Sequence, residues 1–541
     1  MSFSRRDFLR YAGFGTLATL GQPLVAATAA PVALPRQKPR ASSLESPFGF
    51  TPIEHSRADQ LILPPSFRAD MIARWGDSLG SRGSRGGETF GYNCDFNAYF
   101  PLDALQGGKS SSDGLLWTNH EYPVAMFVSR HDGKSRKTAA QIELEKDCIG
   151  GSVVRVRREN GVWKRVADTR TRRFNGFYPQ IAISGPAREL VPVATGTLAN
   201  CSGGRTPWHT VLSCEENFQD YNKKHGWADV AAHTIDEKQY GWVVEVDPFG
   251  ELPPFKHSCL GRFSHENVAW RIGPTGKMVC YMGDDSNDQF LYKFVSAESY
   301  NARQSRADAR KLLQNGTLYA ADFGSGKWLP IDLNRSAKLR EAGFQTQAEV
   351  LVRTREAAAV LGATPLDRPE DCEVHPLDGT LYIALTNNVK HGNYYGQIVR
   401  LLEKEDNPES EGFRYEIFLA GGPQSGLACP DNLTFDSKGN LCVSTDIAGY
   451  NANRGAYDTL GNNGLFMVPT RGADAGTAYQ FASAPVDAEL TGHWFTEDEK
   501  TLFLSVQHPG EESDNLQNLT SHWPDGGAAL PRPSVVAVTG F

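Results

Sequence analysis

Four stretches of this 541-residue chain repeat one pattern, a short strand, a tight turn and a longer apolar strand. The copies are HENVAWRIGPTGKMVCYMGDD from His265, PEDCEVHPLDGTLYIALTNN from Pro369, PDNLTFDSKGNLCVSTD from Pro430 and TGHWFTEDEKTLFLSVQH from Thr491. The pattern is typical of a β-hairpin, and in three of the four copies the turn is closed by Gly. Hairpins that recur at a blade-like period predict one ring rather than a string of independent domains. We therefore expect an all-β fold, a β-propeller of about six blades, because one blade takes roughly 45 residues.

The remaining segments divide the chain into three parts. Residues 1–29 predict a twin-arginine signal peptide, since Arg5 and Arg6 precede an apolar run and small residues. Residues 30–45, rich in Pro, Arg and Ser, predict a linker, and residues 46–541 the propeller. Within the propeller, residues 299–314 and 334–361 have helical composition and predict helical insertions.

The signal peptide predicts export to the periplasm or secretion, with the twin-arginine machinery as a partner. Its apolar run from Tyr11 to Val25 is broken by glycines and Pro23 and is short for a bilayer span, so we expect no stable membrane anchor. The formal net charge is −8, which argues against nucleic acid or an anionic membrane as a partner. We expect a monomer.

Acidic residues stand at equivalent places in three of the four repeats. Glu266, Glu370 and Asp431 come at the start of the first strand of their hairpins, where the fourth copy has Gly492. In a propeller the innermost strands line the central channel, so these side chains should meet at one mouth of the axis. Carboxylates brought together there would repel one another unless cations lay between them.

Three other stretches are dense in oxygen donors. They are NHEY at 119–122, SCEEN at 213–217 and GDDSND at 283–288. Calcium takes six to eight oxygen ligands from carboxylates, carbonyls and water, and these segments offer that set. GDDSND lacks the Gly and Glu positions of an EF-hand loop, so a calcium site here would be of another kind.

The nine cysteines form no CxxC pair, and Cys214 has the most unusual surroundings among them. It ends an apolar run and is followed directly by Glu215 and Glu216. A thiolate is a soft ligand that suits iron, zinc or copper. Two alternatives stay open, a small buried apolar residue and a nucleophile with His120 or His265 as its base.

Taken together, these motifs resemble one known family. NHEY, SCEENF, GWVVEVDP, SHENVAW, GDDSNDQFLYKFVS, RPEDCEVHP and CPDNLTFDSKGNLCVSTD, in this order, are similar to the PhoX family of bacterial alkaline phosphatases. The resemblance runs from about residue 45 to the C-terminus. It implies a propeller that hydrolyses phosphate monoesters with a cluster of Fe³⁺ and Ca²⁺, in which a cysteine thiolate contacts the iron.

The resemblance also implies roles for individual residues. It makes Cys214 the iron-bridging thiolate, Glu266 and Glu370 the carboxylates on iron, and Arg368 the side chain that contacts phosphate. The choice between Glu215 and Glu216, and between Asp284 and Asp285, stays open. Asn119 and His265 would complete the catalytic pocket. The candidates for calcium are Glu121, Glu215, Glu216, Asp284, Glu373 and Asp431.

Two other functions remain as alternatives. Calcium-dependent propellers also open lactones or cleave phosphate diesters, and a periplasmic propeller could bind calcium without catalysing any reaction. Release of phosphate from a small monoester by an iron-containing protein would separate the phosphatase from both.

Overall fold

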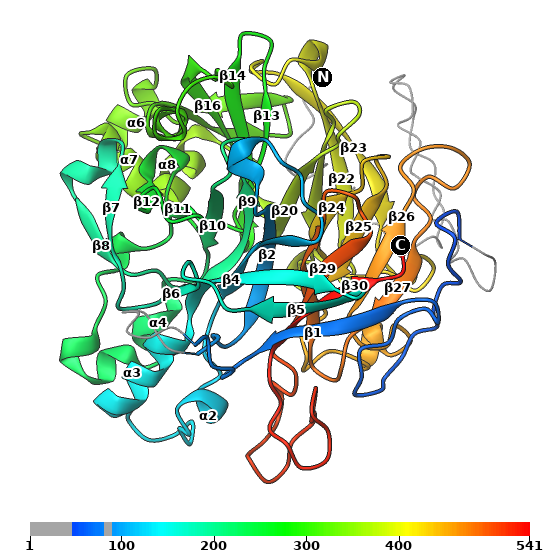
Figure 1. Ribbon diagram of the computed structural model, residues 1–541. Helices are drawn as coiled ribbons and strands as arrows, with labels where there is room; N and C mark the ends of the chain where they lie inside the picture. The colour runs from blue at the N-terminus through cyan, green and yellow to red at the C-terminus, as the bar shows by residue number, and fades with distance from the viewer. Residues whose placement is uncertain (1–45, 81–88) are drawn as a thin grey trace, which may run out of the picture.

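The computed structural model describes residues 46–80 and 89–541, and its β-strands form six large sheets and one two-stranded ribbon (Figure 1). The expected signal peptide, 1–29, and linker, 30–45, lie outside the described residues. The sheets are numbered here along the chain, and each is given from its innermost strand outward.

The first three sheets carry the N-terminal half of the fold. Sheet 1 contains β2 (Cys94–Pro101), β3 (Asp113–His120), β4 (Gly150–Glu159) and β5 (Val162–Val166), with β6 (Arg172–Phe174) on β4. Sheet 2 contains β9 (Asn200–Arg205), β10 (Val211–Glu215), β11 (Val243–Val246), β12 (Phe255–His257), β7 (Gln180–Ser184) and β8 (Val193–Thr195). Sheet 3 contains β13 (Ala269–Ile272), β14 (Lys277–Gly283), β16 (Leu291–Ser299), β17 (Gly316–Asp322) and β18 (Lys327–Pro330).

The other three sheets have four strands each. Sheet 4 contains β20 (Pro369–Val374), β21 (Leu381–Leu385), β22 (Gln397–Glu403) and β23 (Phe413–Ala420). Sheet 5 contains β24 (Pro430–Phe435), β25 (Leu441–Thr445), β26 (Gly464–Val468) and β27 (Tyr479–Ser483). Sheet 6 contains β28 (Glu489–Phe495), β29 (Thr501–Gln507), β30 (Ser534–Thr539) and β1 (Arg68–Arg74). The ribbon pairs β15 (Asn287–Gln289) with β19 (Leu366–Asp367).

Apolar side chains pack between each sheet and the next, and this closes the sheets into a ring. Between sheets 4 and 5, for example, Ile398 packs in one cluster with Val443 and Phe466. A corresponding cluster lies between every other neighbouring pair, including sheets 6 and 1. Each buried side chain of this size stabilises the fold by roughly 1.5–3 kcal/mol. The all-β propeller predicted from the repeats is therefore confirmed.

The ring is joined where the two ends of the propeller meet. Strand β1, near the start of the described chain, pairs antiparallel with β30, from Arg68 opposite Thr539 to Arg74 opposite Ser534. The last sheet is thus completed by the first strand, which leaves no open end in the ring. In Figure 1 the blue β1 runs beside the red C-terminal strand.

Helices lie outside the sheets. The expected insertions contain α5 (Arg306–Ala309) in the first, and α6 (Ala337–Glu341), α7 (Gln347–Val352) and α8 (Thr354–Leu361) in the second. Three further helices are α2 (Ala125–Val128), α3 (Ala139–Cys148) and α4 (Asp220–Lys223). Helix α3 has no helical apolar period, and its sequence signal is the capping box of Thr138 and Gln141. In 46–80 and 89–541, no helix is long and apolar enough to cross a membrane.

Candidate metal centre and active site

The innermost strands are distorted at the end where they reach the channel mouth. Pairing registers shift between Cys94 and Asn97 in β2, between Pro369 and Cys372 in β20, and between Pro430 and Leu433 in β24. A bulge of this kind changes the direction in which the side chains at the end of a strand point. Asp95, Glu370 and Asp431 lie inside these bulges, and all three line one cavity.

Five of the six inner strands supply a side chain with a metal-binding atom at this position. They are Asp95 in β2, Cys201 in β9, Glu266 just before β13, Glu370 in β20 and Asp431 in β24. The sixth position is Gly492 in β28, which has a φ of +55°. A Cβ there would lie 2.3 Å from the backbone oxygen of Asp95, so a side chain would displace the neighbouring strand.

A second set of side chains comes from the loops that follow the second strand of each hairpin. Glu121 follows β3, Glu216 follows β10, Asp446 follows β25 and His508 follows β29. Asp285 follows β14 by two residues. Five of the six inner hairpins therefore deliver polar groups from both ends to the same mouth, whereas no residue of the described loop that follows β21 in sheet 4 lines the cavity. Residues far apart in sequence thus become neighbours.

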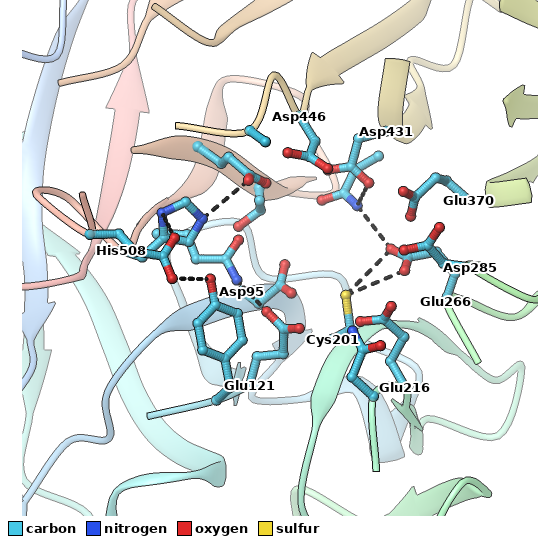
Figure 2. Close-up of a pocket in the computed structure, with 18 of the residues that line it drawn as sticks. Asp95, Glu121, Cys201, Glu216, Glu266, Asp285, Glu370, Asp431, Asp446 and His508 are labelled. Atoms are coloured by element: carbon cyan, nitrogen blue, oxygen red, sulfur yellow. Dashed lines mark hydrogen bonds and ion pairs between the residues drawn. The ribbon is translucent and has the colours of Figure 1, made fainter. Parts of the chain in front are cut away.

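These groups surround a cavity of about 280 Å³ (Figure 2). Eleven carboxylates line it, against one arginine, Arg368, and one histidine, His508. The protein itself thus leaves the cavity with a large excess of negative charge.

The cavity carboxyls respond to this excess. Burial raises the pKa of Glu121 to about 8, with the charge of Asp95 as the next cause. Burial likewise raises the pKa of Asp95 to about 6. The pKa values of Glu266 and Glu370 lie well above the usual range because of burial and the charges of neighbouring carboxylates. Such a cluster either keeps its protons or exchanges them for cations.

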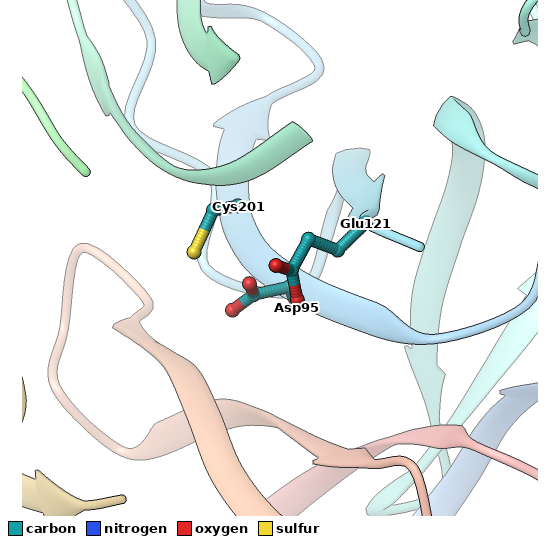
Figure 3. Close-up of side chains that lie close together, drawn as sticks. All are labelled: Asp95, Glu121 and Cys201. Carbon is teal, nitrogen blue, oxygen red and sulfur yellow. The ribbon is translucent and has the colours of Figure 1, made fainter. Parts of the chain in front are cut away.

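The donor groups fit metal ions. Three overlapping sets have ligand atoms within 4.8 Å of one another: Asp95, Glu121 and Cys201; Cys201, Glu216 and Glu266; Glu266, Glu370 and Asp431. Figure 3 shows the first set. Asp95 Oδ1 and Glu216 Oε1 are buried and have no hydrogen-bond partner in the described part of the chain. A cation would supply the partner that these oxygens lack.

Cys201 supplies the sulfur in two of these three sets. Its Sγ lies 3.3 Å from Glu266 Oε2 and 3.5 Å from Glu266 Oε1. Burial, followed by the charges of Asp95 and Glu266, raises the pKa of its thiol well above the usual value. A thiolate at this place therefore needs a bound metal to stabilise it.

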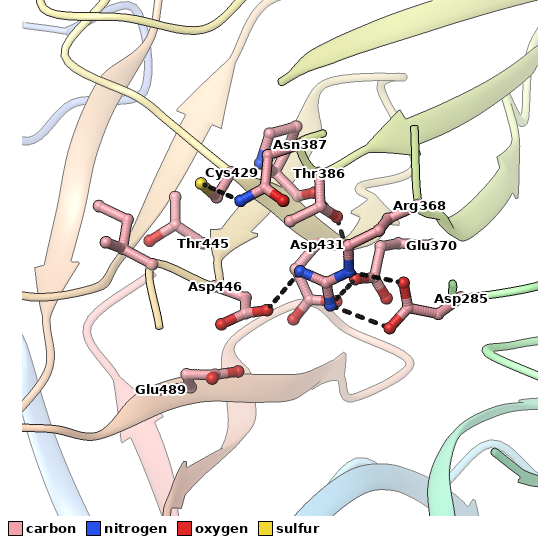
Figure 4. A network of polar contacts seen from close by, with 12 residues as sticks. Asp285, Arg368, Glu370, Thr386, Asn387, Cys429, Asp431, Thr445, Asp446 and Glu489 are labelled. Carbon is pink, nitrogen blue, oxygen red and sulfur yellow. Dashed lines mark hydrogen bonds and ion pairs between the residues drawn. The ribbon is translucent and has the colours of Figure 1, made fainter. Parts of the chain in front are cut away.

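Arg368 brings the one guanidinium to the cavity (Figure 4). Its Nε and Nη2 lie 2.8 and 2.9 Å from the two oxygens of Asp285, and Nη2 lies 2.7 Å from Glu370 Oε1. Nη1 lies 3.1 Å from Asp446 Oδ2. Arg368 has a φ of +54° directly before Pro369, a conformation that costs energy for a residue with a side chain. The contacts on all sides of the guanidinium hold it in this place.

Six of the residues singled out in the sequence line the cavity: Glu121, Glu216, Glu266, Glu370, Asp431 and Arg368. The structure thus brings together the three acidic residues of the repeats, as the propeller geometry predicts. The other six candidates are not among the lining residues.

In each of the two pairs left open by the sequence, one carboxylate is held in an ion pair away from the cavity. Glu215 Oε1 lies 2.6 Å from Lys256 Nζ, and both side chains are fully buried. Asp284 Oδ2 lies 2.9 Å from Arg355 Nε. Glu216 and Asp285 are the members of each pair that line the cavity, and Asp285 pairs there with Arg368.

Cys214 lies in the apolar core and not at the cavity. It is fully buried in a cluster with Leu212, Val243 and Phe263. Successive side chains of a strand point to opposite faces, so the polar sequence around Cys214 does not describe its own surroundings. The structure corrects its assignment: among the nine cysteines, all within the described residues, Cys201 lines the cavity.

Asn119, His265 and Glu373 also stand apart from the cavity. Asn119 Nδ2 donates to the backbone oxygens of Cys201 and Ser202, at 2.5 and 2.9 Å, so it supports the strand that carries Cys201. His265 stacks on Phe263, and burial lowers its pKa to about 3. Glu373 lies in β20 three residues beyond Glu370, and burial raises its pKa to about 8.

Sequence reasoning missed Asp95, Cys201, Asp446, Glu489 and His508, which line the cavity. Asp95 belongs to a hairpin whose turn is longer than that of the repeat, since eleven residues separate β2 from β3. The turn between β9 and β10 has five residues, as between β24 and β25, but its sequence TPWHT does not resemble the turns of the repeat. The available signal was positional, because both are the second residue of an innermost strand.

The fold and the site together define a class. The protein is a β-propeller in which the inner strands gather carboxylates and a thiol into one cavity fitted for metal ions. Residues 48–510 match the family described as alkaline phosphatase PhoX. The chain belongs to the PhoX family of alkaline phosphatases, which are metal-dependent phosphoric monoester hydrolases.

A solved structure agrees with this family. The chain is 32% identical to Pseudomonas fluorescens PhoX in complex with vanadate, a transition state analogue, with a TM-score of 0.79 over 91% of this chain and 97% of that one. The gluconolactonase XC5397 of Xanthomonas campestris matches weakly, with 10% identity and a TM-score of 0.32 over 90% of this chain and 97% of that one. No curated protein sequence matches the chain at a significant level.

Proposed function

We propose that the acidic cavity is the active site at which this alkaline phosphatase hydrolyses small phosphate monoesters, with iron and calcium as its ions. The observation that carries the proposal is the convergence of the three ligand sets on one cavity that also holds Arg368. The vanadate complex of the Pseudomonas fluorescens relative supports the same reaction class.

Iron is assigned to the ligands around the sulfur. A thiolate favours a soft or borderline ion, so Cys201 and Glu266 would hold iron, and Glu370, which shares a ligand set with Glu266, would complete its ligands. The remaining ligands are oxygens, which calcium prefers in a large and flexible shell. The residues proposed to hold calcium are Asp95, Glu121, Glu216 and Asp431.

Bound ions would offset the negative charge of the phosphoryl group and lower the pKa of water at the site. The chain itself contributes orientation. With Glu370 bound to a metal ion, the planar guanidinium of Arg368 would keep one N–H on Nη1 and one on Nη2 that can donate to two phosphate oxygens at once. Asp285 and Asp446 hold it on opposite sides, so its position is fixed before the substrate arrives. Negative charge that develops on the phosphoryl oxygens during transfer would strengthen their hydrogen bonds with Arg368.

The setting of the enzyme is part of the proposal. The twin-arginine sequence in residues 1–29 supports export of the folded, metal-loaded protein to the periplasm or beyond. Substrates would then be small phosphate esters outside the cytoplasm.

Metal analysis of the purified protein combined with phosphate release from 4-nitrophenyl phosphate tests the proposal. We expect iron and calcium on the protein and turnover that depends on both. A colourless protein that contains only calcium and opens a lactone, or one that binds metal and turns over no ester, would contradict it. The variant Glu266→Gln provides a matched check, because Glu266 belongs to two of the three ligand sets.

A further inference from the structure

Beside the reaction cavity lies a second cavity of about 260 Å³. Its polar lining residues are Arg57, Asn453, Arg454, Asn462, Asn463, Asp487 and Thr520. Two segments separate the two cavities. In the first segment, residues 448–450 line the reaction cavity, and Ile447, Gly449 and Ala452 line the side cavity. In the second segment, Glu489 lines the reaction cavity and Asp487 lines the side cavity. Gly449 belongs to both walls, so the side cavity is the direct neighbour of the place where the phosphoryl group would sit.

Tyr450 stands at the rim between them. Its side chain is 63% exposed, the largest exposure of any large apolar or aromatic residue in the described chain. Within residues 46–80 and 89–541 its ring makes no contact with another ring or with a cation. Arg454 Nη1 donates to the backbone oxygen of Tyr450 at 3.2 Å and so ties the rim to the wall of the side cavity.

The loop that carries Tyr450 is well anchored at its other end. Tyr457 is buried, packs edge-on against Tyr395 with ring centroids 5.8 Å apart, and donates to the backbone oxygen of Tyr394 at 2.6 Å. Tyr395 Oη donates to the backbone oxygen of Ala456 at 3.0 Å. The two partnered tyrosines fix the loop, while the ring of Tyr450 is presented to solvent beside a catalytic cavity. An aromatic ring in this setting offers a face for stacking.

The side cavity adds an unused acceptor. Asn453 Nδ2 donates to Asn462 Oδ1 at 3.0 Å, but Asn453 Oδ1 is buried and has no hydrogen-bond partner in the described part of the chain. A buried acceptor without a partner costs free energy unless a donor reaches it. A hydroxyl or amino group of a bound molecule would supply that donor.

We propose that Tyr450 and the side cavity form the subsite for the leaving group, and that they favour phosphate monoesters of alcohols that carry a planar ring and hydrogen-bond donors, such as nucleoside monophosphates. The planar part stacks on Tyr450 and a donor reaches Asn453 Oδ1, while the phosphoryl group remains beside Arg368. This inference rests on the proposed function, because it assigns the other half of the same substrate.

Steady-state kinetics with three substrates tests the subsite. Adenosine 5′-monophosphate has a planar base and donors, 4-nitrophenyl phosphate has a ring without donors, and glycerol 2-phosphate has no ring. Tyr450→Ala should lower kcat/KM about threefold to tenfold for the first two and leave glycerol 2-phosphate unchanged, because a stacked aromatic pair contributes this much. Tyr450→Phe should restore the wild-type values. Asn453→Ala should lower kcat/KM for the nucleotide alone.

Tyr394→Ala is the matched control. Tyr394 is also an exposed tyrosine, 46% exposed on the neighbouring loop, but it does not line either cavity. Its replacement should leave all three substrates unchanged. Inhibition by inorganic phosphate and the metal content should stay constant in every variant, since these depend on the reaction cavity.

The outcomes separate the two proposals. If Tyr450→Ala lowered kcat/KM equally for all three substrates, or for none, the proposed subsite would be wrong. Turnover by the wild type would still support the phosphatase function. A wild-type protein loaded with metal that turned over none of the three esters would contradict the proposed function itself.

Discussion

Two buried groups of charges in this protein are built on opposite plans. In sheet 2, Glu245 accepts from Trp208 Nε1 at 2.7 Å and lies 2.8 Å from His257 Nε2 and 2.9 Å from Arg310 Nε. Burial alone would raise its pKa, but the hydrogen bond and charge of His257, together with Arg310, lower it to about 2. The protein supplies every partner that this carboxylate needs.

At the channel mouth the carboxylates outnumber the cations. Burial and the charge of Asp446 raise the pKa of Asp431 well above its usual value, and the charge of Arg368 offsets only part of this rise. The comparison shows that the fold can neutralise a buried carboxylate completely, and does so a few strands away. The excess of charge at the mouth therefore belongs to a site completed by ions from outside the chain.

Removing those ions should have the largest effect. Excess chelator should reduce phosphatase turnover to background and lower the thermal unfolding temperature, because the cavity carboxylates would again repel one another. Calcium should restore activity better than magnesium, since the oxygen shell is large and has no strict octahedral form. Full activity in chelator, on protein shown to hold no calcium, would contradict this assignment.

Replacing the sulfur of the cavity should have the next largest effect. Cys201→Ser should remove iron, the colour that arises from charge transfer between sulfur and iron, and roughly a hundredfold or more of the turnover. Cys214→Ser is the control, because it places a hydroxyl in an apolar cluster instead. It should cost about 1–3 kcal/mol in the free energy of unfolding and leave iron and colour unchanged. Absorption spectra, iron analysis and urea unfolding measure these effects. Loss of iron and colour in Cys214→Ser but not in Cys201→Ser would show that Cys214 is the iron ligand.

The difference between these two cysteines also shows what the sequence could predict. The repeat at Glu266, Glu370 and Asp431 predicted the propeller and the convergence of acidic residues, because a period of two and a fixed hairpin length place equivalent residues alike. Which of two adjacent residues faces the channel depends on the bulge at each strand start, and no local signal marks a bulge. The acidic neighbours of Cys214 predict a metal ligand where β10 carries an apolar core residue, and the sequence alone does not separate Glu215 from Glu216.

The partners of the excluded residues were equally hidden. Lys256 lies 41 positions from Glu215, and Arg355 lies 71 positions from Asp284 in an inserted helix. Only the packing of helix α8 against sheet 3 brings Arg355 to Asp284. Long-range compensation of this kind decides which carboxylates remain free to bind metal, and it cannot be predicted from one stretch of sequence.

A third change tests the cation that the chain does supply to the mouth. Arg368→Lys should lower kcat roughly tenfold to a thousandfold, because lysine keeps the charge but cannot donate to two phosphate oxygens in one plane. Metal content should not change. Arg355→Lys is the comparison, since Arg355 pairs with Asp284 and does not line the cavity. Turnover should fall far less for this variant, and equal losses for both would remove Arg368 from contact with phosphate.

The smallest effect concerns stability alone, and it probes the neutralised group in sheet 2. Because the pKa of Glu245 falls from 4.5 to about 2 on folding, its ionised form stabilises the native state fully above pH 4.5. This stabilisation is lost as the pH falls through 2, and at full strength it amounts to about 3 kcal/mol. Glu245→Gln should therefore have a lower free energy of unfolding than the wild type at pH 7, and the difference should shrink steadily between pH 4.5 and 2.5.

Urea unfolding of both proteins at each pH measures this difference in free energy. The cavity carboxylates titrate in both proteins, so their contribution cancels. Turnover at pH 7 should be unchanged, since Glu245 does not line the cavity. A difference that stayed constant down to pH 2.5 would show that Glu245 is not held ionised by His257 and Arg310, and the contrast with the channel mouth would then fail.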